Sequence, residues 1–187
     1  MHTALPKIFV FLDQYEDLVF NNNNTDIGII YRNYEDPERE KELIKIAKAC
    51  RKKRYKLFVS NDIKLAIKTK ADGIYIPAFN KIKRFNNTKN KNFTIVGSAH
   101  NQKEIKEKIS QNCKAIFLGP AFHVEKKKNF LGINKFNILT RLNNINAFAL
   151  GGINEKNFSK LKLLNIKGYA GIKMFKKKTG LKKAGFL

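Results

Sequence analysis

The chain contains 187 residues, 43% of them hydrophobic, and carries a formal net charge of +23 from 38 Lys and Arg against 15 Asp and Glu. This length suits a single domain with a substantial core, and the apolar runs are far too short to cross a bilayer, so we expect no membrane partner. Cys50 and Cys113 stand apart without metal-ligand or disulfide spacing, which argues against a zinc site or a disulfide framework.

Short apolar runs recur along the chain and predict β-strands. Within each run the hydrophobicity is nearly continuous rather than alternating, as is typical of parallel strands that are covered on both faces. In chain order, the predicted strands are residues 7–12, 26–32, 56–60, 73–76, 93–98, 115–118, 147–150 and 168–173.

Segments with helical periodicity follow most of these strands. The clearest is DPEREKELIKIAKACRKK, in which Asp36 is predicted as the N-cap and Pro37 as the first helical residue, with acidic residues in the first turn and basic residues in the last. A second helix is predicted to begin after Asn101, with Glu104 in capping-box position, and a third after Asn154. The connection at residues 80–85 and the chain after the last strand leave little room for a helix.

Strands that alternate with helices in this way predict a compact (βα)8 TIM barrel with trimmed helices, formed by residues 1–187 as one domain. An open doubly wound sheet is the alternative fold. Barrels typically have ~250 residues, and their chemistry lies at the C-terminal ends of the strands. The residues that follow each predicted strand are therefore the candidate site residues.

Two strand ends carry features of a phosphate or metal site. Gly151 and Gly152 end the seventh strand, where glycines let backbone N–H groups approach an anion; a tight turn without a ligand is the alternative. Asn61 and Asp62 follow the third strand. Asp62 could bind Mg²⁺ beside a diphosphate or cap the next helix.

Cationic side chains follow two further strands. Arg32 ends the second strand, where its permanently charged fork suits a phosphate or carboxylate, and a salt bridge to Glu35 or Asp36 is the alternative. The loop LGPAFHVEKKKNFLG after the sixth strand carries His123, a candidate general acid, base or donor. Its three consecutive lysines could close over an anionic substrate or simply face solvent.

Taken together, these motifs resemble the thiamine phosphate synthase and TenI superfamily of small phosphate-binding barrels. The resemblance is carried in order by YRNYED, SND followed by LAIKTKADGIYI, IVGSAH, LGPAFHVEKKKNFLG, and ALGGINEKN followed by GYAGI. The combination covers most of the chain. It implies an enzyme of thiamine biosynthesis that joins a pyrimidine diphosphate to a thiazole phosphate with release of diphosphate, assisted by Mg²⁺.

The resemblance also implies roles for individual residues. Arg32, Asn61 and Lys127 would contact the diphosphate, Asp62 would bind Mg²⁺, and Ser98 would lie near the pyrimidine or the diphosphate. The glycines after the seventh strand and in the eighth would hold the thiazole phosphate. The candidate catalytic residues are thus Lys127, His123 and Ser98, the candidate substrate-binding residues are Arg32, Asn61, His100, Gly119, Gly151, Gly152 and Gly171, and the candidate metal ligand is Asp62.

Some positions depart from the synthase pattern and leave alternative functions open. Tyr34 stands where the pattern has a lysine, and Asn80 where it has a second metal-binding carboxylate. A TenI-type thiazole tautomerase, or a non-catalytic binder of thiazole phosphate, would need neither diphosphate nor metal. The tautomerase pattern has a histidine at the position of Pro120, for which His123 or His100 could substitute.

The positive charge supports a further alternative, a basic nucleic-acid-binding protein. The lysines are spread along the chain together with many Asn and Ile, a composition that AT-rich codons produce, and we find no helix-turn-helix or RNA-recognition aromatics. We therefore expect phosphorylated small molecules rather than nucleic acid as partners, while a homo-oligomer stays open. The stretch MHTALPKIFVFLD does not have the pattern of a signal peptide, so a cytoplasmic location is expected.

Overall fold

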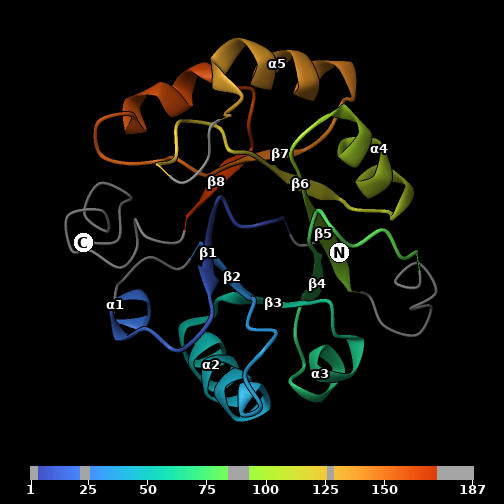
Figure 1. Cartoon of the computed structure of the whole chain (residues 1–187). Coiled ribbons are helices and arrows are strands. Elements are labelled where there is room, and N and C mark those ends of the chain that lie inside the picture. The colour runs from blue at the N-terminus through green and yellow to red at the C-terminus, as the bar shows by residue number, and fades with distance from the viewer. Residues whose placement is uncertain (1–3, 22–25, 84–92, 126–128, 172–187) are drawn as a thin grey trace.

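The computed structural model describes residues 4–21, 26–83, 93–125 and 129–171, which form a ring of strands surrounded by helices (Figure 1). The strands are β1 (Ile8–Leu12), β2 (Ile27–Tyr31), β3 (Lys56–Ser60), β4 (Gly73–Ile76), β5 (Thr94–Ala99), β6 (Ala115–Leu118), β7 (Ala147–Leu150) and β8 (Gly168–Gly171). The helices are α1 (Asp17–Phe20), α2 (Arg39–Lys53), α3 (Ile63–Lys68), α4 (Gln102–Ser110), α5 (Gly132–Leu142) and the 3₁₀ helix η2 (Phe158–Leu163).

All neighbouring strands are parallel and pair in sequence order, and β1 closes the ring by pairing with β8 in the register Ile8 to Tyr169. This closure confirms the predicted (βα)8 barrel and excludes the open doubly wound sheet. The predicted bounds of β3, β4, β6 and β7 are those of the structure. Within the described ranges, the helices are too short or too polar to span a bilayer.

Aromatic rings fill the inside of the barrel. The ring centroid of Phe9 lies 5.5 Å from that of Phe58, 4.9 Å from Phe117 and 5.1 Å from Phe148, at spacings typical of edge-to-face packing. Glycines on adjacent strands make room for these rings, since a Cβ added at Gly28 would lie 2.5 Å from Cδ1 of Phe9. These rings fill the interior, so among the described residues the middle of the barrel holds no ligand cavity.

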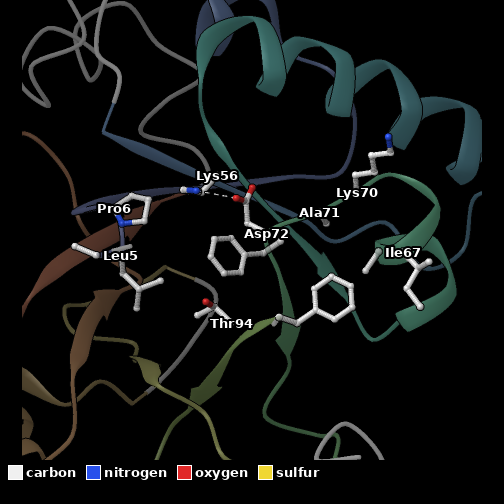
Figure 2. A pocket seen from close by; sticks show the side chains of 12 residues that line it. Leu5, Pro6, Lys56, Ile67, Lys70, Ala71, Asp72 and Thr94 are labelled. Atoms are coloured by element: carbon white, nitrogen blue, oxygen red, sulfur yellow. Dashed lines mark hydrogen bonds and ion pairs between the residues drawn. The ribbon is translucent and has the colours of Figure 1, made fainter. Parts of the chain in front are cut away.

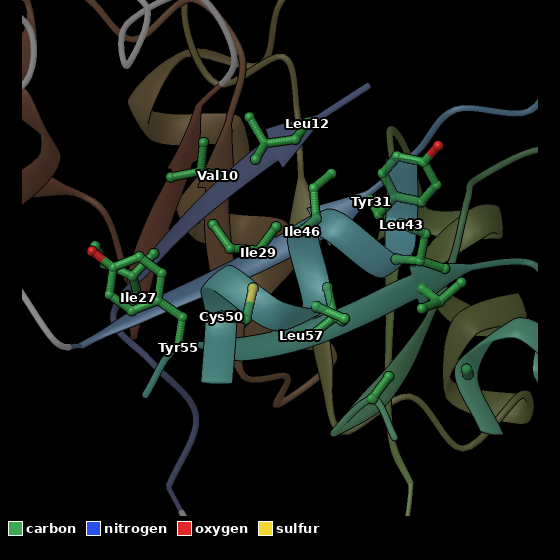
Figure 3. Packing of buried hydrophobic residues seen from close by; sticks show 14 of the residues in the cluster. Val10, Leu12, Ile27, Ile29, Tyr31, Leu43, Ile46, Cys50, Tyr55 and Leu57 are labelled. Carbon is green, nitrogen blue, oxygen red and sulfur yellow. The ribbon is translucent and has the colours of Figure 1, made fainter. Parts of the chain in front are cut away.

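A second apolar layer joins the outside of the strands to the helices. Figure 3 shows Leu43 and Ile46 of α2 packed over Ile29 of β2 and Leu57 of β3. These side chains are at most 3% exposed, and burying each one stabilises the fold by about 1.5–3 kcal/mol. The outward faces of the strands are therefore as apolar as the inward ones, which explains the continuous hydrophobic runs in the sequence.

The helix starts agree with the sequence at α4 and differ at α2. Asn101 caps α4, because its Oδ1 accepts a hydrogen bond from the N–H of Glu104 at 3.0 Å. The prediction that Asp36 caps α2 is wrong: its side chain accepts from the N–H of Glu38 at 2.8 Å in a turn before the helix, which begins at Arg39. Pro37 accordingly lies outside the helix.

The predicted helix after Asn154 is shorter and tighter than expected. Oδ1 of Asn154 accepts from the N–H of Lys156 at 3.0 Å in a local turn, and the 3₁₀ helix η2 starts only at Phe158. Such side-chain turns compete with an α-helical start. This element is one of the trimmed helices that make the barrel compact.

The described residues between β4 and β5 form no helix, and two side chains of the next helix region hold them instead. Nζ of Lys108 donates to the carbonyl of Asn80 at 2.7 Å, and Nε2 of Gln111 donates to the same carbonyl at 2.9 Å and to that of Ile82 at 3.1 Å. Lys108 is fully buried, and burial lowers the pKa of its amine. A buried polar pair thus takes over the role of the missing helix.

Candidate active site

A cavity of about 640 Å³ opens at the C-terminal mouth of the barrel. Residues at or beyond the ends of β1, β2, β4, β5, β6 and β7 line it. This is the face at which TIM barrels place their chemistry, and the lining includes Arg32, Ser98, His100, Gly119 and Gly151 from among the sequence-predicted site residues. The structure therefore brings together predicted residues from four different strands.

A second cavity, of about 400 Å³, lies at the opposite, N-terminal end of the strands. Figure 2 shows Leu5 and Pro6 on one side of it and Ile67 and Ala71 on the other. Lys56 and Asp72 pair there at 2.8 Å, and Asp72 also accepts from the N–H of Leu57. Because these charges already satisfy each other, we assign the chemistry to the C-terminal mouth.

Arg32 lies at the mouth between an aromatic ring and a carboxylate. Its guanidinium carbon is 5.5 Å from the ring centroid of Phe11, and its Nε is 3.6 Å from Oδ1 of Asp13. The salt-bridge partner of Arg32 is therefore Asp13, at the end of the neighbouring strand. The alternative partner suggested by the sequence was Glu35 or Asp36. Asp13 contacts Nε of Arg32, so among the described residues the two terminal NH₂ groups of this side chain are available to a phosphate.

Ser98 at the end of β5 is held by a tyrosine from β4. The hydroxyl of Tyr75 donates to Oγ of Ser98 at 2.8 Å, and burial raises the pKa of Tyr75 to about 12. Tyr75 therefore stays a hydrogen-bond donor at physiological pH. Because Ser98 accepts from Tyr75, its own O–H can donate to a ligand in the cavity.

The two candidate histidines lie in different places. The ring of His100 lines the cavity, with Nδ1 hydrogen-bonded to the carbonyl of Gly119. A carbonyl can only accept, so Nδ1 carries the proton in this contact and Nε2 is the nitrogen available to a ligand. His123 is exposed, packs edge-on against Phe130 at 5.9 Å and does not line the cavity.

The glycine pair after β7 forms a left-handed turn packed against the loop after β6. Gly151 and Gly152 have φ angles of 86° and 73°, which glycine adopts without strain. A Cβ at Gly152 would lie 2.6 Å from the carbonyl oxygen of His123 and closer still to that of Phe122. Among the described residues, no group accepts a hydrogen bond from the N–H of Gly152 or Ile153, so both can donate to an anion.

The other predicted glycines frame this turn. The N–H of Gly119 donates to the carbonyl of Ala99 at 3.1 Å, and the N–H of Ala121 donates to that of Leu150 at 2.8 Å. The first bond holds the loop after β6 to the end of β5, and the second holds it to the end of β7. Gly171 is the last residue of β8 and is buried without lining the cavity.

The candidate metal ligand Asp62 caps α3. Its Oδ1 accepts from the N–H of Leu65 at 2.9 Å, and its Oδ2 lies 3.9 Å from Arg39. Neighbouring Asn61 has a left-handed φ of 58°, and its Oδ1 accepts from Nδ2 of Asn80 at 2.8 Å. The predicted capping role of Asp62 is thus confirmed.

The donors near Asp62 set a limit on how Mg²⁺ could bind. The described residues contain no cluster of three or more His, Cys, Asp or Glu side chains that could hold a metal ion. Asp62 does not line the cavity, but a single carboxylate suits Mg²⁺ that keeps water and substrate phosphates as its other ligands. Asp62 fits that role through Oδ2, and its metal binding stays a prediction.

Some site features escaped the sequence analysis or lie beyond the structure. Lys127 is outside the described residues, so its predicted role is not tested. Tyr34, Tyr75 and Phe79 form an aromatic part of the lining that the sequence analysis did not assign. The signal available for Tyr75 was its position one residue before the end of β4, which places it on the same face as Pro77 two residues later.

Comparisons with known proteins agree with this geometry. A family model described as thiamine monophosphate synthase matches residues 25–175. Two proteins of Prochlorococcus marinus, both named thiamine-phosphate synthase, are 36% identical over 130 residues and 34% identical over 158 residues, which is 68% and 77% of this chain. These matches cover 37% and 43% of the relatives, so the chain spans about two fifths of their length.

Among solved structures, a thiamine phosphate pyrophosphorylase from Pyrococcus furiosus is similar with a TM-score of 0.73. The match covers 95% of this chain and 91% of that chain at 18% sequence identity. An aldolase of 4-hydroxy-2-oxoglutarate and a phosphogluconate derivative has a TM-score of 0.68 at 14% identity. At these identities the likeness shows the barrel fold.

Proposed function

This chain belongs to the thiamine monophosphate synthase family, and from that premise we propose that it joins a pyrimidine diphosphate to a thiazole phosphate with release of diphosphate. The observation that carries the proposal is the cavity at the barrel mouth, which Arg32, Ser98 and Gly151 line; Gly152 follows directly in the left-handed turn at its edge. Each of these groups can bind a phosphate oxygen, and they come from three different strand ends.

The geometry supports a division of the cavity between two phosphate groups. Arg32 and Ser98 would hold the diphosphate, which gains negative charge as it leaves with the electron pair of the broken bond. The free N–H groups of Gly152 and Ile153 would hold the phosphate of the thiazole. Holding both substrates in one cavity replaces a bimolecular encounter by an oriented one.

Mg²⁺ is part of the proposal through Asp62 alone. When bound, the ion would neutralise charge on the diphosphate, and Oδ2 of Asp62, the oxygen that does not cap α3, would be its protein ligand. Arg39 at 3.9 Å from this oxygen would compete with the ion. We therefore expect weak binding of Mg²⁺ in the absence of a diphosphate.

A thiazole tautomerase or a binder of thiazole phosphate is the second candidate. The observation in its favour is His100, whose ring contacts the carbonyl of Gly119 next to Pro120, the position at which the tautomerase pattern has a histidine. Nε2 of His100 could accept and return a proton there. Asn80 in place of a metal-binding carboxylate would also be no obstacle to this chemistry.

Product analysis distinguishes the two candidates. We expect purified protein to form thiamine phosphate from the pyrimidine diphosphate and the thiazole phosphate, more rapidly with Mg²⁺ than without it, and His100→Ala to retain part of this activity. Tautomerisation of the thiazole that requires His100, with no thiamine phosphate formed at any Mg²⁺ concentration, would replace the synthase proposal by the second candidate.

A further inference from the structure

An aromatic pair stands at the rim of the cavity with much of its surface in solvent. Phe79 is 70% exposed and Tyr34 is 37% exposed, and their ring centroids lie 6.1 Å apart at an interplanar angle of 74°. Both line the cavity. A single exposed phenylalanine is common on protein surfaces, but one that meets a second ring nearly at right angles at the edge of a site offers a flat ligand one face for stacking and a second ring for an edge-to-face contact.

The turn that carries Phe79 is held in place by the residue after it. The N–H of Asn80 donates to the carbonyl of Pro77 at 3.1 Å, and its Nδ2 donates to Oδ1 of Asn61 at 2.8 Å. The Asn80 carbonyl accepts from buried Lys108 and Gln111 at 2.7 and 2.9 Å. The exposure of Phe79 is therefore built into the fold and does not come from a loose loop.

Tyr34 is fixed from the opposite side. Its hydroxyl is hydrogen-bonded at 2.6 Å to Oγ of Ser60, which is 1% exposed. Burial raises the pKa of Tyr34, so the hydroxyl remains neutral at physiological pH. The ring is thus an uncharged surface of fixed orientation, at the position where the synthase pattern has a lysine.

The charges around the pair favour recognition of a ring over recognition of a diphosphate. The described lining contains Arg32, which already faces Asp13 at 3.6 Å, and the further carboxylate of Glu35. With a tyrosine in place of a lysine at residue 34, Arg32 is the single Lys or Arg side chain in the described lining, so a diphosphate would meet one cation on this side of the cavity and not two. Stacking on an aromatic side chain needs only the π-face of a flat ring.

We propose that Tyr34 and Phe79 form an aromatic clamp that selects the flat heterocyclic ring of the substrate at the cavity mouth. The clamp rests on the proposed function and adds one statement to it: the heterocyclic ring is the part of the ligand that contributes most to its selection. The phosphate of the same ligand would point across the cavity to the turn at Gly152. The substrate class is a planar nitrogen heterocycle that carries a phosphate group.

Calorimetry with thiazole phosphate, the pyrimidine alcohol without its diphosphate, and inorganic pyrophosphate tests the clamp. Phe79→Ala should lower the affinity for both heterocycles on the order of tenfold, the typical effect of removing one stacking ring, and should leave the affinity for pyrophosphate unchanged. Leu142→Ala is the matched control, since Leu142 is 72% exposed on α5 and does not line the cavity. Tyr34→Lys should raise the affinity for pyrophosphate and lower the affinity for the heterocycles.

A tryptophan at residue 79 gives an independent measurement. The chain contains no Trp, so Phe79→Trp places a single indole at the mouth, where it should retain heterocycle affinity and change fluorescence on binding. Wild-type affinity of Phe79→Ala for both heterocycles would overturn the clamp. Equal weakening of heterocycles and pyrophosphate would also overturn it, because it would indicate that the variant had lost the cavity as a whole.

The outcomes for the clamp and for the proposed reaction are separable. Binding of heterocycles that depends on Phe79, with no thiamine phosphate formed, would retain the clamp and reject the synthase reaction. Thiamine phosphate formed with the same KM by wild type and Phe79→Ala would retain the reaction and reject the clamp. Failure of the wild type to bind either heterocycle would reject both.

Discussion

Replacing Gly152 with alanine should separate the effect of backbone strain from that of a collision at the turn after β7. Gly152 has a φ of 73°, and an added Cβ would lie 2.6 Å from the carbonyl oxygen of His123, below the 3.0 Å that real Cβ atoms keep. The colliding atoms belong to the backbone, so the loop after β6 must move. A left-handed φ costs a non-glycine residue about 1 kcal/mol, and overpacking adds about 1–3 kcal/mol.

Gly132→Ala is the matched control. Gly132 has a similar φ of 66°, but among the described residues its added Cβ would have no neighbour closer than 3.8 Å, so only the strain of about 1 kcal/mol should appear. We expect Gly152→Ala to unfold with a free energy lower by about 2 kcal/mol than that of Gly132→Ala, or roughly 4–8 °C lower in Tm for a chain of this size. Thermal unfolding followed by circular dichroism measures both variants.

The same comparison tests the role of the turn in binding. Gly152→Ala should lower the affinity for thiazole phosphate, because moving the turn displaces the N–H groups of Gly152 and Ile153. Gly132→Ala should leave this affinity unchanged. Equal stability of the two variants would refute the geometry of the turn. Unchanged affinity of Gly152→Ala for thiazole phosphate would refute its assignment as the phosphate site.

Three further predictions follow from the charged groups. Arg32→Ala should lower the affinity for the pyrimidine diphosphate by roughly 10- to 100-fold in calorimetry, the range for a lost charge-assisted hydrogen bond, and Arg32→Lys should recover part of the loss. Lys127→Ala should also lower this affinity. Wild-type affinity in both alanine variants would contradict the diphosphate assignment. Burial lowers the pKa of Lys108 from 10.5, so the folded state binds fewer protons than the unfolded state between the lowered pKa and 10.5. The wild type should therefore gain stability relative to Lys108→Met as the pH rises through that window. A difference in the free energy of urea unfolding that does not change with pH would count against this. The +23 charge should give binding to random duplex DNA that falls steeply with salt, and tight binding that persists at high salt would revive the nucleic-acid function.

Much of the barrel could be predicted from the sequence because its strands are buried on both faces. Runs such as IFVFL and AIFL contain no polar residue, and they become the fully buried strands β1 and β6. Helix starts were less predictable where a polar side chain could serve two local structures. Asp36 and Asn154 each accept hydrogen bonds in a turn ahead of the helix that they were expected to cap.

The site was predicted in position and only partly in detail. The rule that chemistry follows the C-terminal ends of the strands located Arg32, Ser98 and Gly151 correctly around one cavity. The pairing of Arg32 with Asp13 was missed, because these residues come from neighbouring strands and the sequence offered nearer carboxylates. The choice between His100 and His123 likewise depended on the path of the loop after β6, which no local pattern sets.

The most direct test of the central claim is to locate where thiazole phosphate binds by following backbone amide signals in NMR during a titration. We expect the largest shifts at Gly152 and Ile153, with smaller shifts at Ser98 and His100, which line the cavity at the C-terminal mouth. The largest shifts at Lys56, Asp72 and Thr94, which line the cavity at the other end of the barrel, would contradict the claim.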